Sequence, residues 1–340
     1  MRRARARMGA WNVSGGSLEW VRQERPEPDA SETLVKVAYS GICGSDLAKL
    51  TRAPIPSPGR AWCPGHEIAG WDLGTSPPRP VVVNPLIPCT RCGRCATGDT
   101  HLCPGLRRVG WDLPGGFAEY LTTPVGQVVE VPGGEGLRNG VLADPMAVAV
   151  HGVRCGLATV PPARLGVIGS GAVAICTAAY AAHIGWDVTL LVRAPSRLGA
   201  LNGRLSALIR PVPDSSNPGF DAVVDAASGH TNQPLDLAIA LVRDGGHVLV
   251  QNAYDPGVRL RRDLRDVFRR SLTISGSFSF CRDDFTEALG LLAPCPSWAA
   301  PLTRALFPLR VLPTALARMS GHDRARPLKA ILTTESAAQR

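Results

Sequence analysis

The sequence lacks any apolar run of the length that crosses a membrane. None of its hydrophobic stretches reaches the roughly 18–20 residues that a bilayer-spanning helix needs. The first eight residues, Met1 to Met8, are rich in arginine, but no apolar segment follows them, so a secretory signal is not expected. We therefore expect no membrane partner and a cytoplasmic location.

Lysine and aromatic residues are also scarce. Lysine occurs only at positions 36, 49 and 329, so arginine supplies nearly all of the positive charge behind the formal net charge of +9. The arginines are spread through every segment among abundant Ala, Gly and Pro, as GC-rich coding produces. Aromatic residues make up only 5%, and no basic stripe with interleaved aromatics is present, so nucleic-acid binding is not expected.

The chain does contain enough apolar material for two domains. It has 340 residues, of which 45% are hydrophobic. Its first part holds short β-type runs broken by Gly and Pro, which favour an irregular β-barrel, and a helix is expected over Ala143–Gly156. From Arg164 onwards strands alternate with helices, which predicts an α/β unit with a doubly wound parallel sheet. We expect domains at 1–155 and 156–295, with 296–340 returning to the first.

Four of the ten cysteines are crowded into a short segment. Cys89, Cys92, Cys95 and Cys103 follow the spacing Cys-x2-Cys-x2-Cys-x7-Cys. Four thiolates at this spacing can enclose one Zn²⁺ in a tetrahedron, and such a closed site serves folding rather than chemistry. Disulfide pairing is the weaker interpretation in a chain without an export signal. The sequence therefore predicts a structural zinc lobe over residues 89–103.

A second set of ligand-type residues is scattered ahead of and behind this lobe. Cys43 and His66 lie on tight turns, and Glu67 and Asp144 compete for a carboxylate position. A catalytic zinc needs three protein ligands and one open position. We expect Cys43, His66 and one of the two carboxylates to bind it, and Asp46 to orient the His66 ring or, alternatively, to cap a turn.

A glycine-rich turn carries the cofactor prediction. The run Val167-Ile168-Gly169-Ser170-Gly171-Ala172-Val173-Ala174 follows a predicted strand and opens a predicted helix. Gly169 suits the tight turn, and Gly171 lets a pyrophosphate approach the helix N-terminus, which Ala172 and Val173 begin. In this setting the pattern predicts a dinucleotide site.

The end of the next strand bears on which dinucleotide is used. An NAD enzyme carries an acid there, whereas this chain has Val192, followed by Arg193 and Arg197. Two guanidinium groups suit a 2′-phosphate, so NADP(H) is favoured over NAD(H). Two alternatives stay open: ordinary surface arginines, or a register shifted by one residue.

The order of these motifs resembles the zinc-containing medium-chain dehydrogenases, in the sorbitol and threonine dehydrogenase branch. The resemblance implies a GroES-like catalytic domain, a Rossmann domain, and a catalytic zinc held by Cys43, His66 and Glu67, with Asp144 binding directly or through water. The family usually has Glu at the Asp144 position and often has His where this chain has Ala48. The matching stretches are Val37–Leu47, Pro64–Gly70, Val82–Cys103, Gly115–Leu121, Asp144–His151, Gly169–Ala174 and Leu272–Phe278.

The resemblance implies hydride transfer between NAD(P) and a secondary alcohol or its ketone. Ser45 is the expected proton relay, with two zinc ions per chain and assembly as a homodimer or homotetramer. Val37–Leu47 also resembles the 2-deoxy-scyllo-inosamine dehydrogenases, which suggests secondary metabolism and a polyol, sugar or aminocyclitol substrate. The competing hypothesis is a zinc-stabilised binding or regulatory protein without turnover, which Ala48, Asp144 and the short segment Gly70–Val81 favour.

Overall fold

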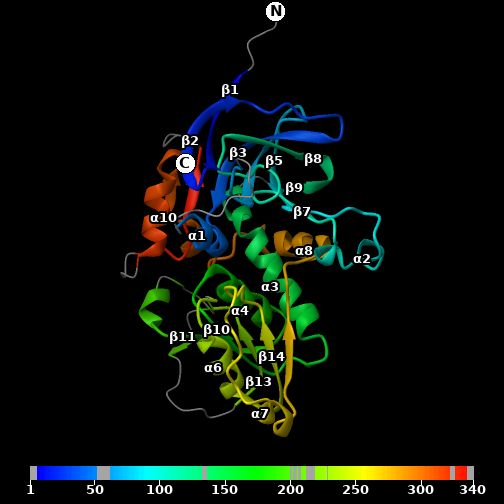
Figure 1. Cartoon of the computed structure of the whole chain (residues 1–340), viewed down its shortest axis with the longest axis vertical. Helices are drawn as coiled ribbons and strands as arrows, with labels where there is room; N and C mark the ends of the chain where they lie inside the picture. Colours follow the sequence, from blue (N-terminus) through cyan, green and yellow to red (C-terminus); the bar gives the residue numbers. More distant parts are fainter. Residues whose placement is uncertain are drawn as a thin grey trace, which may run out of the picture. The chain divides into compact units, whose positions relative to one another are not determined.

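The structure, a computed structural model, describes residues 6–51, 62–131, 136–199, 201, 205, 208–211, 219–227, 229–321 and 326–334 (Figure 1). The chain divides into two compact units: unit 1 comprises Met1–Asp144 and Cys281–Arg340, and unit 2 comprises Pro145–Phe280. Each unit has its own sheet. Among the described residues, no helix is both long and apolar enough to span a lipid bilayer.

Unit 1 is built on antiparallel strands. Its main sheet has the order β16-β17-β3-β4-β5-β9, and β8 pairs with β3 beside this path. The last strand of the chain, β17, pairs with β3 so that Ile331 lies opposite Gly41, which returns the C-terminal segment to the first strands. The strands of unit 1 are β1 (Arg7–Ser14), β2 (Ser17–Glu24), β3 (Glu32–Gly41), β4 (Glu67–Asp72), β5 (Arg79–Val83), β6 (Leu86–Ile87), β7 (Arg107–Arg108), β8 (Tyr120–Pro124), β9 (Val128–Glu130), β16 (Leu306–Pro308) and β17 (Ile331–Thr333).

The helices of unit 1 are short and lie at the ends of these strands. Their bounds are α1 (Gly44–Leu50), α2 (Gly93–Ala96), α8 (Arg282–Leu292), α9 (Ala300–Thr303) and α10 (Leu312–Ser320), and α3 (Ala143–Gly156) begins in unit 1 and continues into unit 2. Alternate residues of β3, β4 and β5 are buried in a core of Val35, Val37, Ile68, Val81 and Val83. These side chains share one face of the sheet, and most residues on the opposite face of the same strands are buried as well.

Unit 2 is a parallel sheet covered by helices (Figure 1). The strand order of this sheet is β12-β11-β10-β13-β14-β15. From β10, the chain adds strands first on one side and then, starting with β13, on the other. Doubly wound sheets bind ligands at this change of side, between β10 and β13. Helix α4 packs on β10 and β11, and α6 packs on β13 and β14. The elements are β10 (Arg164–Ile168), α4 (Ala172–His183), β11 (Asp187–Val192), β12 (Ile209–Pro211), β13 (Phe220–Asp225), α6 (Gln233–Leu241), β14 (Val242–Val250), α7 (Leu264–Arg269) and β15 (Thr273–Gly276).

The expected α/β architecture, an irregular β domain with a doubly wound parallel domain, is confirmed. After the exposed Arg164, every residue of the central strand β10 is buried, because both faces of a parallel sheet are covered.

Candidate functional site

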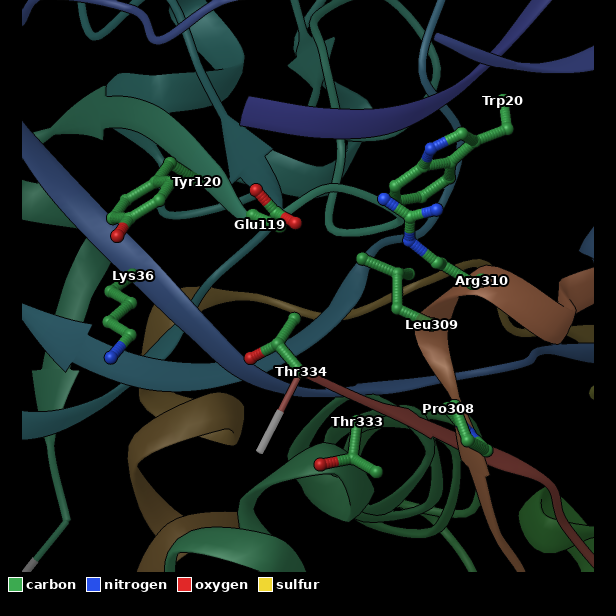
Figure 2. A pocket seen from close by; sticks show the side chains of 9 residues that line it. All are labelled: Trp20, Lys36, Glu119, Tyr120, Pro308, Leu309, Arg310, Thr333 and Thr334. Carbon is green, nitrogen blue, oxygen red and sulfur yellow. The ribbon is translucent and has the colours of Figure 1, made fainter. Parts of the chain in front are cut away.

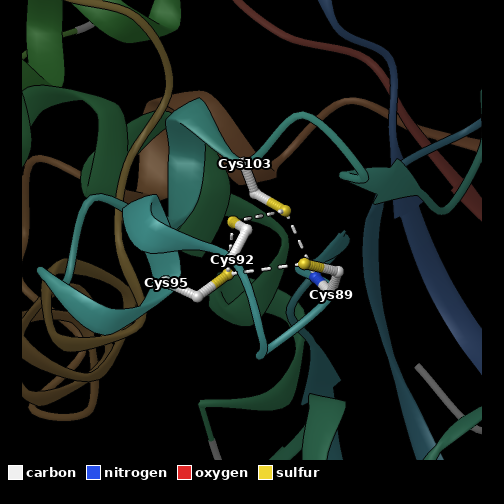
Figure 3. A group of neighbouring side chains, drawn as sticks. All are labelled: Cys89, Cys92, Cys95 and Cys103. Atoms are coloured by element: carbon white, nitrogen blue, oxygen red, sulfur yellow. Dashed lines mark hydrogen bonds between the residues drawn. The ribbon is translucent and has the colours of Figure 1, made fainter.

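The four cysteines of the predicted structural lobe converge in the loop around α2 (Figure 3). The Sγ atoms of Cys92 and Cys95 are 3.5 Å apart, those of Cys92 and Cys103 are 3.8 Å apart, and those of Cys89 and Cys95 are 4.0 Å apart. All four thiols are free of disulfides. A tetrahedron with Zn–S bonds of about 2.3 Å has edges of about 3.8 Å, so the cluster already has the dimensions of a tetrathiolate zinc site.

The protonation of these thiols also fits a cation. The backbone N–H of Arg91 and then the Cys103 thiol lower the pKa of Cys89 to about 6, whereas desolvation and the neighbouring Cys92 thiol raise the pKa of Cys95 to about 12. The cluster therefore does not hold four negative charges by itself. A dication bound among the four sulfur atoms would stabilise their deprotonated, thiolate forms.

Cys43, His66 and Glu67 form a second cluster, in which one ligand atom of each residue lies within 4.8 Å of the others. Cys43 caps the N-terminus of α1 directly after β3, and His66 and Glu67 stand at the start of β4. The pairing of β3 with β4 places Gly41 opposite Glu67, so the antiparallel register brings the two turns together. The imidazole and carboxylate are buried, while Cys43 is half-buried.

Asp46 connects two members of this cluster. Its Oδ2 accepts a hydrogen bond of 3.0 Å from the backbone N–H of Cys43, and its Oδ1 lies 3.7 Å from His66 Nδ1. The indole nitrogen of Trp111 also lies 3.4 Å from Nδ1. An Nδ1–H directed at Asp46 would leave the lone pair of Nε2 for a metal. Burial acts to lower the pKa of His66, but Asp46 and then Cys43 raise it more, so the net pKa is well above its usual value. Asp46 thus both caps α1 and orients the ring.

The Glu67 carboxylate forms an ion pair with Lys329, and both side chains are almost completely buried. Lys329 precedes β17, and its ammonium also donates to the carbonyl oxygen of Ile42 at 3.5 Å. A side chain at Gly41 would have no room here, because a Cβ atom would lie 2.0 Å from Glu67 Oε2 and 2.8 Å from Lys329 Cε. Burial acts to lower the pKa of Lys329, but Glu67 raises it more, so the lysine stays charged.

Asp144 and Ser45 complete the surroundings of the cluster. Asp144 stands in the first turn of α3 and interacts electrostatically with His66 and Glu67, although it is not among the residues whose ligand atoms lie within 4.8 Å. Burial raises the pKa of Asp144 to about 6, and His66 offsets part of that rise. Ser45 lies half-buried in the first turn of α1, two residues after Cys43.

The charges of this region fit a bound dication. Among the described residues, Asp46, Glu67, Asp144 and the Cys43 thiol interact with the side-chain cations His66 and Lys329, and Asp46 also interacts with Lys49 at longer range. Burial raises the pKa of both Asp46 and Asp144, so the acids are held back from ionising. One soft sulfur, one imidazole and one carboxylate are donors that Zn²⁺ accepts.

The predicted cofactor turn lies at the switch point of the parallel sheet of unit 2. Gly169 has φ of +139°, and a Cβ atom there would lie 2.6 Å from the carbonyl oxygen of Ala226, so only glycine fits. Gly171 is the N-cap of α4, with nothing within 4 Å of its missing side chain, and Ala172 and Val173 form the first turn. The open backbone N–H groups and the helix dipole suit a pyrophosphate.

The end of β11 lies beside this turn. The backbone N–H of Gly169 donates to the carbonyl oxygen of Leu191 at 3.1 Å, which brings the following residues close to the glycine turn. Val192 is buried as the last residue of β11, and the Arg193 side chain is exposed. The Arg197 side chain lies outside the part of the chain that the structure describes.

A cavity of about 310 Å³ on unit 1 holds none of the predicted site residues (Figure 2). Two of its charged groups have partners: Arg310 stacks over the Trp20 ring at 5.1 Å, and Glu119 accepts a hydrogen bond of 2.8 Å from the backbone N–H of Gly9. The cavity therefore offers no chemistry comparable to that of the Cys43 cluster.

Lys329 and Trp111 are two parts of the site that sequence reasoning missed. Lys329 carried one signal, a lysine within the apolar run Leu328–Leu332, where a charged residue needs a buried partner. Trp111 carried none, because its contact with His66 joins residues 45 positions apart.

Comparisons with known proteins agree with this geometry. Residues 29–133 match the family model of the alcohol dehydrogenase GroES-like domain. The chain is 30% identical over 294 residues to D-altritol 5-dehydrogenase of Agrobacterium fabrum, which covers 80% of this chain and 84% of the relative. It is 29% identical over 295 residues to L-galactonate-5-dehydrogenase of Escherichia coli, covering 81% of this chain and 84% of the relative.

Two solved structures have the same fold. A zinc-binding dehydrogenase of Sinorhizobium meliloti bound to NADP is 25% identical, with a TM-score of 0.77 over 97% of this chain and 100% of the other. A thermostable alcohol dehydrogenase of Pyrobaculum aerophilum has a TM-score of 0.82 at 23% identity, covering 96% of this chain and 100% of the other.

A GroES-like barrel with paired metal-ligand clusters and a Rossmann sheet defines a class of oxidoreductase. The chain belongs to the zinc-containing medium-chain alcohol dehydrogenase family. It is an enzyme of that class, a zinc-type alcohol dehydrogenase that carries out NAD(P)-dependent oxidoreduction of small-molecule alcohols.

The buried ion pair leads to a stability prediction. Lys329→Met leaves the Glu67 carboxylate buried without its partner, which should cost about 3–5 kcal/mol of the free energy of unfolding. Chemical denaturation of the zinc-loaded protein measures this loss. Lys36→Met, which removes an exposed lysine from β3, serves as the control and should change stability by no more than about 0.5 kcal/mol. Equal stabilities of the two variants would contradict the structural role of the pair.

Proposed function

We propose that this protein transfers a hydride between NADP(H) and a secondary hydroxyl, or the corresponding ketone, of a polyol, sugar or (amino)cyclitol. The observation that carries this proposal is the Cys43–His66–Glu67 cluster, whose donor set of one sulfur, one imidazole and one carboxylate suits a dication. The D-altritol and L-galactonate dehydrogenases among the relatives support a polyhydroxylated substrate.

The residues around the cluster would divide the chemistry as follows. A zinc ion bound there supplies Lewis-acid polarisation of the substrate oxygen, while the nicotinamide exchanges the hydride. Cys43, His66 and Glu67 would hold the metal, with Asp144 competing with Glu67 for the carboxylate place. Asp46 would keep the His66 ring oriented, and Ser45 would pass the hydroxyl proton towards water.

The Glu67–Lys329 pair bears on which carboxylate serves. A carboxylate that already balances a buried ammonium donates less electron density to a metal, so Lys329 weakens the case for Glu67 as a strong ligand. Asp144, with its raised pKa of about 6, is the acid that gains most from a nearby dication. The third protein ligand of the zinc ion is therefore either Glu67 or Asp144.

We assign two zinc ions to each chain, one in the Cys43 cluster and one in the tetrathiolate lobe. Unit 1 would be the catalytic domain and unit 2 the dinucleotide-binding domain, with Gly169, Gly171, Ala172 and Val173 around the pyrophosphate. We further propose a cytoplasmic homodimer or homotetramer without nucleic-acid or membrane partners.

Metal analysis tests the division between the two zinc sites. Cys43→Ala should lose about one zinc ion per chain and keep its fold, because that site has an open position and serves chemistry. Cys92→Ala should give poorly folded protein, because the binding energy of a structural zinc contributes directly to folding. Zinc content and circular dichroism measure both results, and identical behaviour of the two variants would overturn the division.

The proposed proton relay predicts a kinetic effect. Ser45→Ala should lower turnover by roughly 10²-fold or more, the usual weight of a general acid–base step. Steady-state kinetics with a saturating polyol checks this, and unchanged zinc content of the variant serves as its control. Turnover close to that of the native enzyme would remove Ser45 from the proton path.

The cofactor preference is tested on unit 2. Because Val192 stands where an acid would repel a 2′-phosphate, and Arg193 follows it, we expect NADP(H) to be preferred by about tenfold to a hundredfold. Arg193→Ala should reduce the ratio of kcat/KM values for NADPH and NADH. Arg164→Ala is the matched control, because this exposed arginine is the first residue of β10 and lies at the amino ends of the strands, whereas Arg193 follows the carboxyl end of β11. A ratio that Arg193→Ala leaves unchanged would contradict the assignment.

A further inference from the structure

Helix α1 carries a lysine close to the candidate zinc cluster. Lys49 is half-buried, and its Nζ lies 2.9 Å from the centre of the Trp111 ring and 5.7 Å from that of Trp62. The indole nitrogen of Trp111 in turn lies 3.4 Å from Nδ1 of His66, and the two rings are 6.0 Å apart. The ammonium group is therefore separated from a candidate metal ligand by a single aromatic ring.

Within the described parts of the chain, Lys49 forms no direct ion pair with a carboxylate. Arg108 also approaches the Trp111 ring, at 5.0 Å, but its guanidinium is paired with Asp112 at 3.0 Å. Lys49 interacts with Asp46 and Asp112 only at longer range, and burial followed by Arg108 lowers its pKa to about 8. Contact with aromatic faces offsets only part of the cost of taking a cation out of water.

A second donor in the same place is also unmet. Trp62 is only 7% exposed, and its Nε1–H has no hydrogen-bond acceptor among the described residues. The backbone of Trp62 is fixed, because its N–H and carbonyl both bond to Val13. The half-buried Lys49 ammonium and the buried Trp62 N–H are thus two donors without a hydrogen-bond acceptor among the described residues. A carboxylate has two oxygen atoms and can accept a hydrogen bond from each donor.

We propose that Lys49, with the Trp62 indole N–H, binds the carboxylate of a sugar-acid substrate whose secondary hydroxyl reacts at the Cys43–His66–Glu67 cluster. This inference rests on the proposed function and narrows its substrate class. The same ammonium repels an aminocyclitol, which carries positive charge, and gains no ion pair from a neutral polyol.

A matched pair of compounds tests the proposal. L-galactonate and galactitol differ in having a carboxylate or a CH2OH group at one end of the same carbon chain. Native enzyme should prefer L-galactonate, and Lys49→Met should lower the ratio of the two kcat/KM values by about tenfold or more, mainly through KM. Lys49→Arg keeps the cation and should retain most of the preference. Lys36→Met removes an exposed lysine on β3 and should leave the ratio unchanged.

Binding calorimetry separates failure of the inference from failure of the proposed function. The zinc-loaded protein without cofactor should bind L-galactonate at least tenfold more tightly in its native form than as Lys49→Met. If neither compound is oxidised but binding of L-galactonate still depends on Lys49, the proposed function fails while the assignment of Lys49 to the carboxylate is retained. If galactitol is oxidised as well as L-galactonate, or if Lys49→Met with native circular dichroism changes neither the ratio nor the binding, the inference is overturned.

Discussion

The buried ion pair between Glu67 and Lys329 ties together segments that are far apart in the chain. Glu67 begins β4, Lys329 precedes β17, and Gly41 at the end of β3 leaves the space in which the two charges meet. Burying two charges is costly unless they are paired, so this contact constrains the way in which the C-terminal segment joins the first strands. Cys43 and His66 each lie within two residues of Gly41 or Glu67, and the pair therefore also sets the positions of the candidate ligands.

The electrostatics of the cluster follow from this arrangement. Lys329 compensates Glu67, and Asp46 compensates His66, so the Cys43 thiol and Asp144 are left to balance a bound cation. One thiolate and one carboxylate would bring a bound dication close to neutral charge, and the metal would supply Lewis-acid polarisation of the substrate oxygen. Lys49 lies beyond the Trp111 ring from His66, and our proposal assigns its charge to the carboxylate of the substrate.

Much of this protein could be predicted because its signals are local. The Cys89–Cys103 spacing predicts a tetrathiolate lobe since four thiols within fifteen positions can reach one ion without help from the rest of the fold. The turn from Gly169 to Ala174 is local in the same way, because Gly169 has no alternative at φ of +139°. Alternating strands and helices after Arg164 likewise predicted the parallel sheet, although the short edge strand β12 left no clear pattern.

The sequence by itself determined the family, the two domain types and the residue types of both metal clusters, because motif spacing and hydrophobic period act over a few residues. Only the tertiary structure decided which charges meet. Lys329 pairs with Glu67, and Trp111 stands between His66 and Lys49, although these residues are tens to hundreds of positions apart. Contacts of this kind depend on strand register and on the path of connecting loops, which fix distances that no local pattern encodes.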